Sequence, residues 1–348
     1  MYTLFNRQQY FDDLIARIKD VKSGDRLLFM TMSIDFIDKA MIEFKQALIE
    51  AANKGARVVL LLDSYTFMLG GKLKFGPLFY SNNISLCFKN SVFYQTNRTI
   101  SELIKQGVEV KILNAPLRKF SNPFKGRSHI KLSIINDDIF IGGINLISDK
   151  TCDVMVLFND KKIADQLYLL GLNILSKGYS NKAIEDDFFL PINQTDQIII
   201  DKGLPNKSLI FDSAIKLINE AKDDLLLICQ FFPDKQLILP LRDAYNRGVK
   251  VRIIFNNFSK HKFPFNILHF LVVFYFKLKL PKVFFKSEVP IDRYFLHAKV
   301  LISDKTAMIG SHNFVYTGVK FGTSEICLIS NNRLLSKNLK DFSDSLIK

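Results

Sequence analysis

Two segments of 17 residues, 129–145 and 297–313, align with each other without a gap. The first reads HIKLSIINDDIFIGGIN and the second reads HAKVLISDKTAMIGSHN. Each begins with a histidine and a lysine two residues apart, continues through two short apolar runs separated by a polar turn, and ends in an asparagine. Because side chains alternate along an extended strand, the histidine and the lysine face the same side. The chain has only five histidines, so the two copies indicate a duplicated functional segment.

The chain around these segments repeats as well. In each half the sequence predicts a buried strand, a helix that ends at a glycine, and a second buried strand. In the first half these are residues 25–34, the helix positions Ile37, Met41, Phe44, Leu48 and Ala51, then Gly55 and residues 56–63; in the second half they are residues 223–230, Leu237, Leu241 and Ala244, then Gly248 and residues 249–255. Such strand–helix–strand units predict a largely parallel or mixed sheet flanked by helices in each half.

We therefore expect an α/β fold made of two tandem lobes. A polar, interrupted stretch marks the boundary, with a first lobe over 1–178, a linker over 179–206 and a second lobe over 207–348. Each lobe is long enough to bury its own core. Further helices are predicted near the N-terminus, with Phe11, Leu14, Ile15 and Ile18 on one stripe, and at residues 161–177.

Composition limits the partners and the compartment. The net charge of +14 favours an anionic partner, either a nucleic acid or an acidic membrane surface. The four cysteines are scattered, without the clusters of a disulfide framework or a structural zinc site, which fits a reducing compartment. The N-terminal sequence lacks the features of a signal peptide, and no apolar run reaches the length of a membrane span.

The duplicated segments resemble the HxK(x)4D motif of the phospholipase D superfamily, with its trailing Gly-(Gly/Ser)-x-Asn. The second copy matches at His297, Lys299, Asp304, Gly310, Ser311 and Asn313. The first copy matches at His129, Lys131, Gly142, Gly143 and Asn145, but has Asn136 where the family has aspartate. From this departure we expect reduced rather than abolished activity.

The resemblance implies a shared active site between two lobes related by a pseudo-twofold axis. It implies that one histidine attacks phosphorus and the other handles the proton of the leaving oxygen, and either His129 or His297 can be the nucleophile. Lys131, Lys299, Asn145 and Asn313 would stabilise the phosphate oxygens, with Asp304 as a further catalytic residue. Asn136, Asp153, Ser311 and Glu325 are supporting candidates, since Asp153 or Glu325 can orient either imidazole. No metal or other cofactor is expected.

Within the superfamily the chain is most similar to bacterial cardiolipin synthases. The first copy ends in Gly-Gly-Ile-Asn at 142–145, and residues 230–234 (QFFPD) are similar to the aromatic–proline turn of that group. The resemblance implies a phosphatidyltransferase that acts on anionic phospholipids. The alternatives are a hydrolase of the phospholipase D type, an endonuclease or nucleic-acid phosphodiesterase of the same superfamily, and a membrane scaffold with a disabled first motif.

Two aromatic insertions favour a lipid substrate. Residues 65–80 and 263–286 each separate a predicted parallel strand from a His-x-Lys segment. The apolar stretch 263–276 is bordered by lysines and suits a helix that lies in a membrane interface, although a buried core helix has the same pattern. We expect membrane contact through Phe265, Leu268, Phe270, Phe274 and Phe276. The corresponding location is the cytoplasm, peripherally on the inner face of the membrane; the sequence predicts no oligomeric state.

Overall fold

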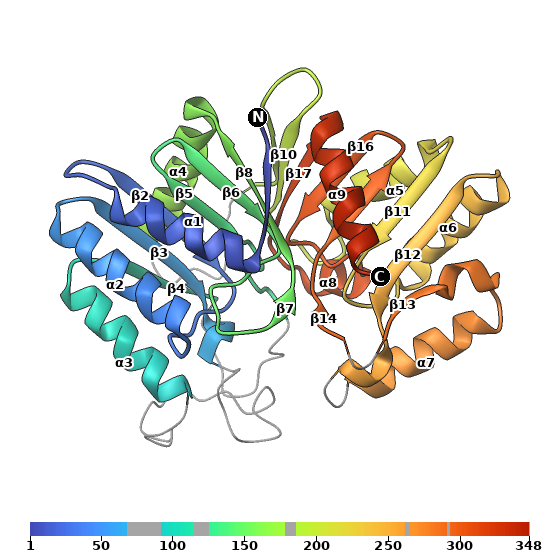
Figure 1. Ribbon diagram of the computed structural model, residues 1–348, viewed down its shortest axis with the longest axis horizontal. Helices are drawn as coiled ribbons and strands as arrows, with labels where there is room; N and C mark the ends of the chain where they lie inside the picture. The colour runs from blue at the N-terminus through green and yellow to red at the C-terminus, as the bar shows by residue number, and fades with distance from the viewer. Residues whose placement is uncertain (68–91, 115–124, 178–185, 262–264, 291–292, 348) are drawn as a thin grey trace.

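The computed structural model describes residues 1–67, 92–114, 125–177, 186–261, 265–290 and 293–347. Its elements form two halves that lie side by side, each a β-sheet with helices (Figure 1). Most of the first aromatic insertion, residues 68–80, lies outside the described residues.

The first sheet has the order β1-β8-β6-β5-β2-β3-β4, and the second has the order β13-β12-β11-β15-β16-β17-β10-β9. The first lobe contains β1 (Thr3–Asn6), α1 (Arg7–Lys19), β2 (Arg26–Thr31), α2 (Lys39–Asn53), β3 (Arg57–Asp63), α3 (Val92–Lys105), β4 (Glu109–Leu113), β5 (Leu132–Ile135), β6 (Asp138–Gly142), β7 (Thr151–Cys152), β8 (Val154–Asn159) and α4 (Lys161–Ser176). The second lobe contains β9 (Phe188–Pro191), β10 (Gln197–Asp201), α5 (Leu209–Glu220), β11 (Asp224–Ile228), α6 (Lys235–Asn246), β12 (Lys250–Asn256), α7 (Phe265–Lys277), β13 (Ser287–Val289), β14 (Phe295–Leu296), β15 (Val300–Ser303), β16 (Thr306–Gly310), α8 (Tyr316–Phe321), β17 (Glu325–Ser330) and α9 (Arg333–Ser345).

Three apolar clusters hold the layers together. One covers the outer face of the first sheet and includes α1 and α2, and another covers the outer face of the second sheet and includes α5 and α6. The third is shared, because it contains residues of both sheets together with α4 and α9. This central cluster joins the two lobes into one packed body, because apolar side chains from both halves are buried against each other.

Each sheet is mixed, and the parallel part is smaller than the sequence pattern suggested. Among the described strands of the first sheet, β2, β3 and β4 run parallel, whereas β5, β6, β8 and β1 pair antiparallel. The second lobe repeats this pattern, with β11 parallel to β12 and antiparallel to β15. The strand–helix–strand units explain the parallel part; the duplicated segments are antiparallel hairpins, which need only a short turn.

Part of the expected linker over 179–206 belongs to the second sheet. Strands β9 and β10 lie in this stretch, and β10 pairs with β17 of the second sheet. In Ile198, Ile199 and Ile200 the strand has one short apolar run between polar residues, all three fully buried. A run of three apolar residues is too short to show the alternation of a strand, so this part of the sequence resembled a polar connection.

Candidate active site

The two His-x-Lys segments meet at the junction of the lobes. They precede the hairpin strands β5 and β15, and each is hydrogen-bonded to the opposite lobe. The backbone N–H of His129 donates to the carbonyl of Ser324 at 2.8 Å, and the N–H of His297 donates to the carbonyl of Cys152 at 2.8 Å. Strand β14 also pairs in parallel with β7. These reciprocal contacts form a pseudo-twofold junction with both histidines beside it.

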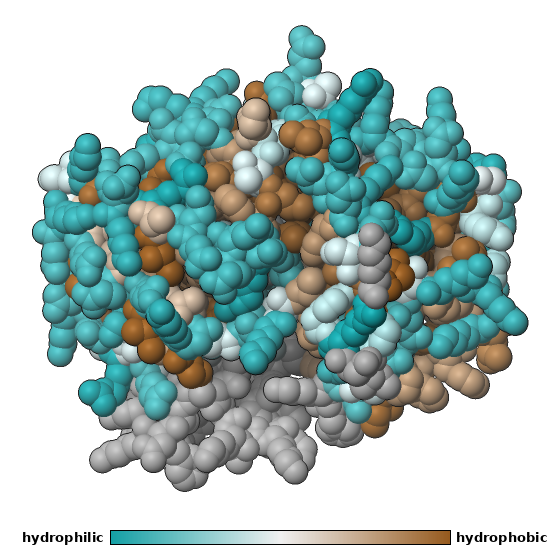
Figure 2. All heavy atoms as spheres, viewed as in Figure 1, coloured by the Kyte–Doolittle hydropathy of each residue, from teal (hydrophilic) through white to brown (hydrophobic). Residues whose placement is uncertain are grey.

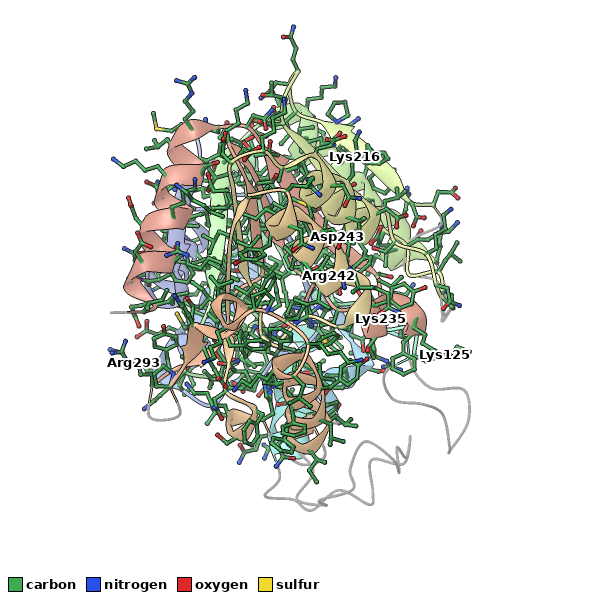
Figure 3. The ribbon with its side chains drawn as sticks, turned by 90° about the vertical axis from the view of Figure 1, so that its right-hand side faces the viewer. Lys125, Lys216, Lys235, Arg242, Asp243 and Arg293 are labelled. Carbon is green, nitrogen blue, oxygen red and sulfur yellow. The ribbon has the colours of Figure 1, made fainter. Side chains whose placement is uncertain are left out.

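The same arrangement is visible from the side. Lys125 and Arg293 each stand four residues before a motif histidine, and Figure 3 shows them at similar height on opposite sides of the view. Helix α7 lies at a similar level (Figure 1). Both histidine segments therefore begin at a similar level of the molecule.

His129 is paired with a carboxylate of the second lobe. Its Nδ1 lies 3.0 and 3.1 Å from the two carboxylate oxygens of Glu325. Burial lowers the pKa of His129 well below its usual value, and the charges of Lys131 and Lys299 lower it further. Burial also raises the pKa of Glu325. Because Nδ1 faces the carboxylate, Nε2 is the nitrogen left for chemistry.

His297 is paired with a carboxylate of the first lobe. Its Nδ1 lies 2.6 Å from Oδ2 of Asp153, whereas Nζ of Lys299 lies 2.8 Å from the same Nδ1. One nitrogen cannot both donate to Asp153 and accept from Lys299, so we assign the Nδ1 proton to the shorter bond. Burial, followed by the charge of Lys299, lowers the pKa of His297 to about 4. Burial acts to raise the pKa of Asp153, but Lys299 and His297 outweigh it and the net pKa is lowered.

The two motif lysines are buried. Lys131 and Lys299 are each 1 % exposed, and each Nζ donates to the backbone carbonyl of the histidine two residues before it. Burial lowers the pKa of both lysines. Positive charge held away from water interacts more strongly with the oxygens of a bound phosphate than it does in bulk solvent.

Asn145, Ser311 and Asn313 stand at the ends of the two duplicated segments. The side-chain oxygens of Asn145 and Asn313 are buried, and no described residue hydrogen-bonds to them. Ser311 donates its hydroxyl to Glu325, which fixes the carboxylate that faces His129. In the first copy Gly143 takes the place of Ser311, and a Cβ there would lie 2.2 Å from Oδ1 of Asp153.

Asp304 and Asn136 do not contact the histidines. They occupy the turns of the two hairpins, at the opposite end of β15 and β5 from the His-x-Lys segments, both with a φ of 53°. Asp304 accepts from the backbone N–H groups of Lys222, Asp223 and Asp224, at 3.0, 2.9 and 3.0 Å. Asn136 accepts from the N–H of Arg26 at 3.1 Å. This position corrects the expectation of a catalytic Asp304, and both residues are assigned a structural role in the turn.

The motif led us to miss a third histidine in the site. His312 is 3 % exposed and its Nδ1 accepts from the N–H of Phe314 at 2.9 Å. Burial lowers its pKa to about 4, while the charge of Glu325 acts in the opposite direction. It fills the variable position between Ser311 and Asn313, where the first copy has Ile144. The sequence feature that could have identified His312 is the presence of a histidine at a position that the motif leaves variable.

The described residues contain no group of three or more histidine, cysteine, aspartate or glutamate side chains able to hold a metal ion. The convergent polar groups are therefore imidazoles, carboxylates, ammonium groups and amides. This set can supply a nucleophile, a proton donor and positive charge for a phosphodiester.

Comparison with known proteins identifies the family of this chain. The family model described as "Cardiolipin synthase, PLD-like domain" matches residues 14–168 and 214–346. A curated cardiolipin synthase of Clostridium perfringens (strain 13 / Type A) is 25% identical over 337 residues, which cover 89% of this chain and 62% of the relative. A second, from Clostridium perfringens strain SM101, is 25% identical over 334 residues with the same coverage. The chain thus spans about 62% of the length of these relatives.

Two solved structures share the fold. The phosphatidylserine synthase of Haemophilus influenzae Rd KW20 aligns over 100% of this chain and 86% of its own, with a TM-score of 0.72 and 12% identity. The polyphosphate kinase of Porphyromonas gingivalis aligns over 100% of this chain and 50% of its own, with a TM-score of 0.62 and 13% identity. The two segments that the family model matches coincide with the two lobes, and each contains one His-x-Lys motif. The chain belongs to the cardiolipin synthase family of phospholipase D-like domains.

Proposed function

We propose that this protein transfers a phosphatidyl group from one phospholipid to the hydroxyl of another through a phosphohistidine intermediate. The observation that carries the proposal is the pair of crossed contacts, His129 with Glu325 and His297 with Asp153. Each contact fixes an imidazole by its Nδ1 and leaves Nε2 for the substrate. Two such imidazoles suit a double displacement, in which one histidine is the nucleophile and the other handles protons.

The steps follow from this division of labour. Nε2 of one histidine attacks phosphorus, and the bond to the leaving alkoxide breaks as the second histidine donates a proton to that oxygen. The anionic phosphodiester beside this second imidazole favours its protonated form, against the effect of burial. The second histidine then accepts the proton of the incoming hydroxyl, whose oxygen attacks phosphorus and releases the first imidazole. Lys131 and Lys299 balance the charge on the non-bridging oxygens in both steps.

Helix α7 supports a lipid surface as the place where the substrate is met. Phe265, Leu268, Phe270 and Phe274 are 39 %, 56 %, 41 % and 52 % exposed. Figure 2 shows apolar side chains gathered over this helix at the lower right of the view. The expected contact of Phe276 is wrong, because this side chain is 7 % exposed and packs in the second-lobe core.

The charge around α7 favours anionic lipids. Residues 258–286 include Lys260, Lys277, Lys279, Lys282 and Lys286 and contain no aspartate or glutamate. Within the described residues, no helix is both long and apolar enough to cross a bilayer. We infer that α7 lies in the interface, on the cytoplasmic leaflet, where anionic lipids attract basic segments.

The deciding experiment uses purified protein with phosphatidylglycerol liposomes and mass spectrometry of the lipid products. Cardiolipin and free glycerol are expected from the unaltered protein and neither from His129→Ala or His297→Ala. Phosphatidic acid as the sole product would replace transfer by hydrolysis. Absence of any lipid product, together with cleavage of oligonucleotides that requires both histidines, would overturn the proposal in favour of a nuclease, which the net charge of +14 also suits.

A further inference from the structure

The two lobes differ beside their histidines. Two residues before His129 stands Arg127, and two residues before His297 stands Phe295. At the end of the neighbouring parallel strand the first lobe has Asp63 and the second has Asn256. The backbone contact is the same in both, because Asp63 accepts from the N–H of Ser128 at 2.6 Å and Asn256 accepts from the N–H of Leu296 at 2.9 Å. The lobes therefore share a clamp but differ in charge.

Arg127 uses only part of its guanidinium in the structure. The side chain is 5 % exposed, and Nη1 donates to Oδ1 of Asp63 at 3.0 Å and to the hydroxyl of Ser64 at 2.8 Å. Its Nε is buried, and among the described residues none accepts a hydrogen bond from Nε. Asp63, 0 % exposed, holds the guanidinium in place from the other side.

Nε, which has no acceptor among the described residues, lies on the edge of the guanidinium that recognises anions. Nε and Nη2 present two parallel N–H groups, which match the spacing of two oxygens on a phosphate or carboxylate. A buried N–H without an acceptor lowers the stability of the fold, so a site that keeps one open is expected to receive a ligand. Phe295, at the equivalent position, instead packs its ring against His261, with ring centroids 5.4 Å apart.

Arg127 also shares a face of its segment with the motif residues His129 and Lys131. Side chains alternate along an extended segment, so Arg127, His129 and Lys131 face the same way. Two residues of extended chain span roughly 7 Å. A group held by Arg127 would thus lie on the same side of the segment as the phosphodiester at His129.

We propose that the Nε–Nη2 edge of Arg127 binds the phosphate of the acceptor, so that the first lobe holds the acceptor and the second lobe does not. This inference rests on the proposed transfer, in which the donor phosphodiester occupies the space between His129 and His297. A second phosphate then belongs to the other lipid, and in a phosphatidylglycerol-type acceptor three glycerol carbons separate it from the attacking hydroxyl. The chemistry that Arg127 recognises is an alcohol that carries a phosphate.

The test compares two soluble acceptors on the same liposomes of phosphatidylglycerol. Isotopically labelled glycerol and labelled glycerol 3-phosphate are offered together, and mass spectrometry measures how much of each label enters lipid. The variant is the double substitution Asp63→Asn with Arg127→Met, which copies the uncharged second-lobe arrangement and leaves no buried charge unpaired. The preference for the phosphate-bearing acceptor is expected to fall by about 10- to 100-fold, mainly through its KM.

Two further variants separate recognition from structure. Arg127→Lys keeps the charge beside Asp63 but lacks the fork, so it is expected to lose most of the preference as well. Phe295→Met, the matched change in the second lobe, is expected to alter incorporation of the two labels by the same factor. Thermal unfolding of each variant checks that the fold is kept.

The possible failures are distinguishable. Equal preference in the unaltered protein and the double variant, with transfer still occurring, would overturn the role of Arg127 while leaving the transferase proposal intact. An equal loss of both labels in the double variant would assign Arg127 a purely structural role. No transfer to either alcohol by the unaltered protein would overturn the proposed function and, with it, the acceptor site.

Discussion

Gly143 and Asp153 show how one missing side chain permits the contact between Asp153 and His297. A Cβ on Gly143 would lie 2.2 Å from Oδ1 and 2.5 Å from Oδ2 of Asp153. No side-chain rotation relieves an overlap of this size while Asp153 still bonds to His297. The glycine is therefore required by space, and its counterpart Ser311 is allowed because Glu325 accepts its hydroxyl.

Gly143→Ala is expected to reduce activity by about 10²- to 10⁴-fold, the range for loss of general acid–base catalysis, because Asp153 can no longer orient His297. Phosphatidyl transfer at saturating lipid measures the effect. Gly318→Ala is the matched control, since a Cβ there meets its nearest neighbour at 3.9 Å. Full activity in Gly143→Ala would show that the Asp153–His297 contact is dispensable.

The turn residues give a second prediction, which concerns stability. Asp304→Ala removes the acceptor for three backbone N–H groups and places alanine at a φ of 53°, so it is expected to lower the free energy of unfolding by about 2 kcal/mol or more. Asn136→Asp is expected to leave the rate unchanged, because Asn136 already makes the turn contact. Denaturant unfolding and activity well below the transition are the measurements. A large gain of activity in Asn136→Asp would restore the catalytic interpretation.

At this scale the sequence predicted the histidines and lysines but not the roles of their neighbours. The spacing of His297 and Lys299 is local and needs only an extended chain to be read. The role of Asp304 depends on which end of its hairpin it occupies. The family motif made it a catalytic candidate, but it lies in the turn, at the end away from His297. The pairing of Asp153 with His297 crosses 144 residues of chain, so only the folded junction could select it from the alternatives.

Among the elements, α7 shows what periodicity leaves undecided. The helix is apolar on nearly all sides, so a core helix and an interfacial helix have the same pattern. Folding buries His269, Val273 and Phe276 and leaves the remaining apolar side chains largely exposed. Phe276 was misassigned for this reason: its identity fits both faces, and only packing against Phe232, with ring centroids 5.9 Å apart, distinguishes them.

The double substitution Leu268→Glu with Leu271→Glu is expected to weaken binding to anionic liposomes by at least about tenfold. Each side chain is more than half exposed in the structure, at 56 % and 55 %, and burial of a leucine in lipid contributes about 1.5–3 kcal/mol. Liposome flotation measures the binding. Leu169→Glu, at 58 % exposure on α4, controls for loss of an exposed leucine elsewhere. Equal binding by both variants would remove α7 from the membrane contact.

For the whole molecule, the crossed contacts make the two lobes one functional unit. The carboxylate of each lobe faces the histidine of the other, and the shared apolar cluster fixes their relative position. The repeat predicted two lobes, and the family resemblance implied their pseudo-twofold relation. It missed β10 in the supposed linker, because three isoleucines carry no register until β17 pairs with them.

Crossed pairing predicts a specific pattern of energetic coupling. In double-mutant cycles on the free energy of unfolding, Asp153→Asn and His297→Gln are expected to couple by about 1–3 kcal/mol, as residues in direct contact do. Asp153→Asn and His129→Gln, which share no hydrogen bond, are expected to couple clearly less. The reverse pattern would mean that each carboxylate serves the histidine of its own lobe.

The crossed junction also bears on how such a chain arises. A single ancestral lobe would present a histidine without its carboxylate and a carboxylate without its histidine, so it would be complete only as a symmetric dimer. After fusion of two gene copies, the two halves of one chain can differ in sequence. The guanidinium at residue 127 and the phenyl ring at residue 295 are a difference that a symmetric dimer, with one sequence for both halves, could not have had.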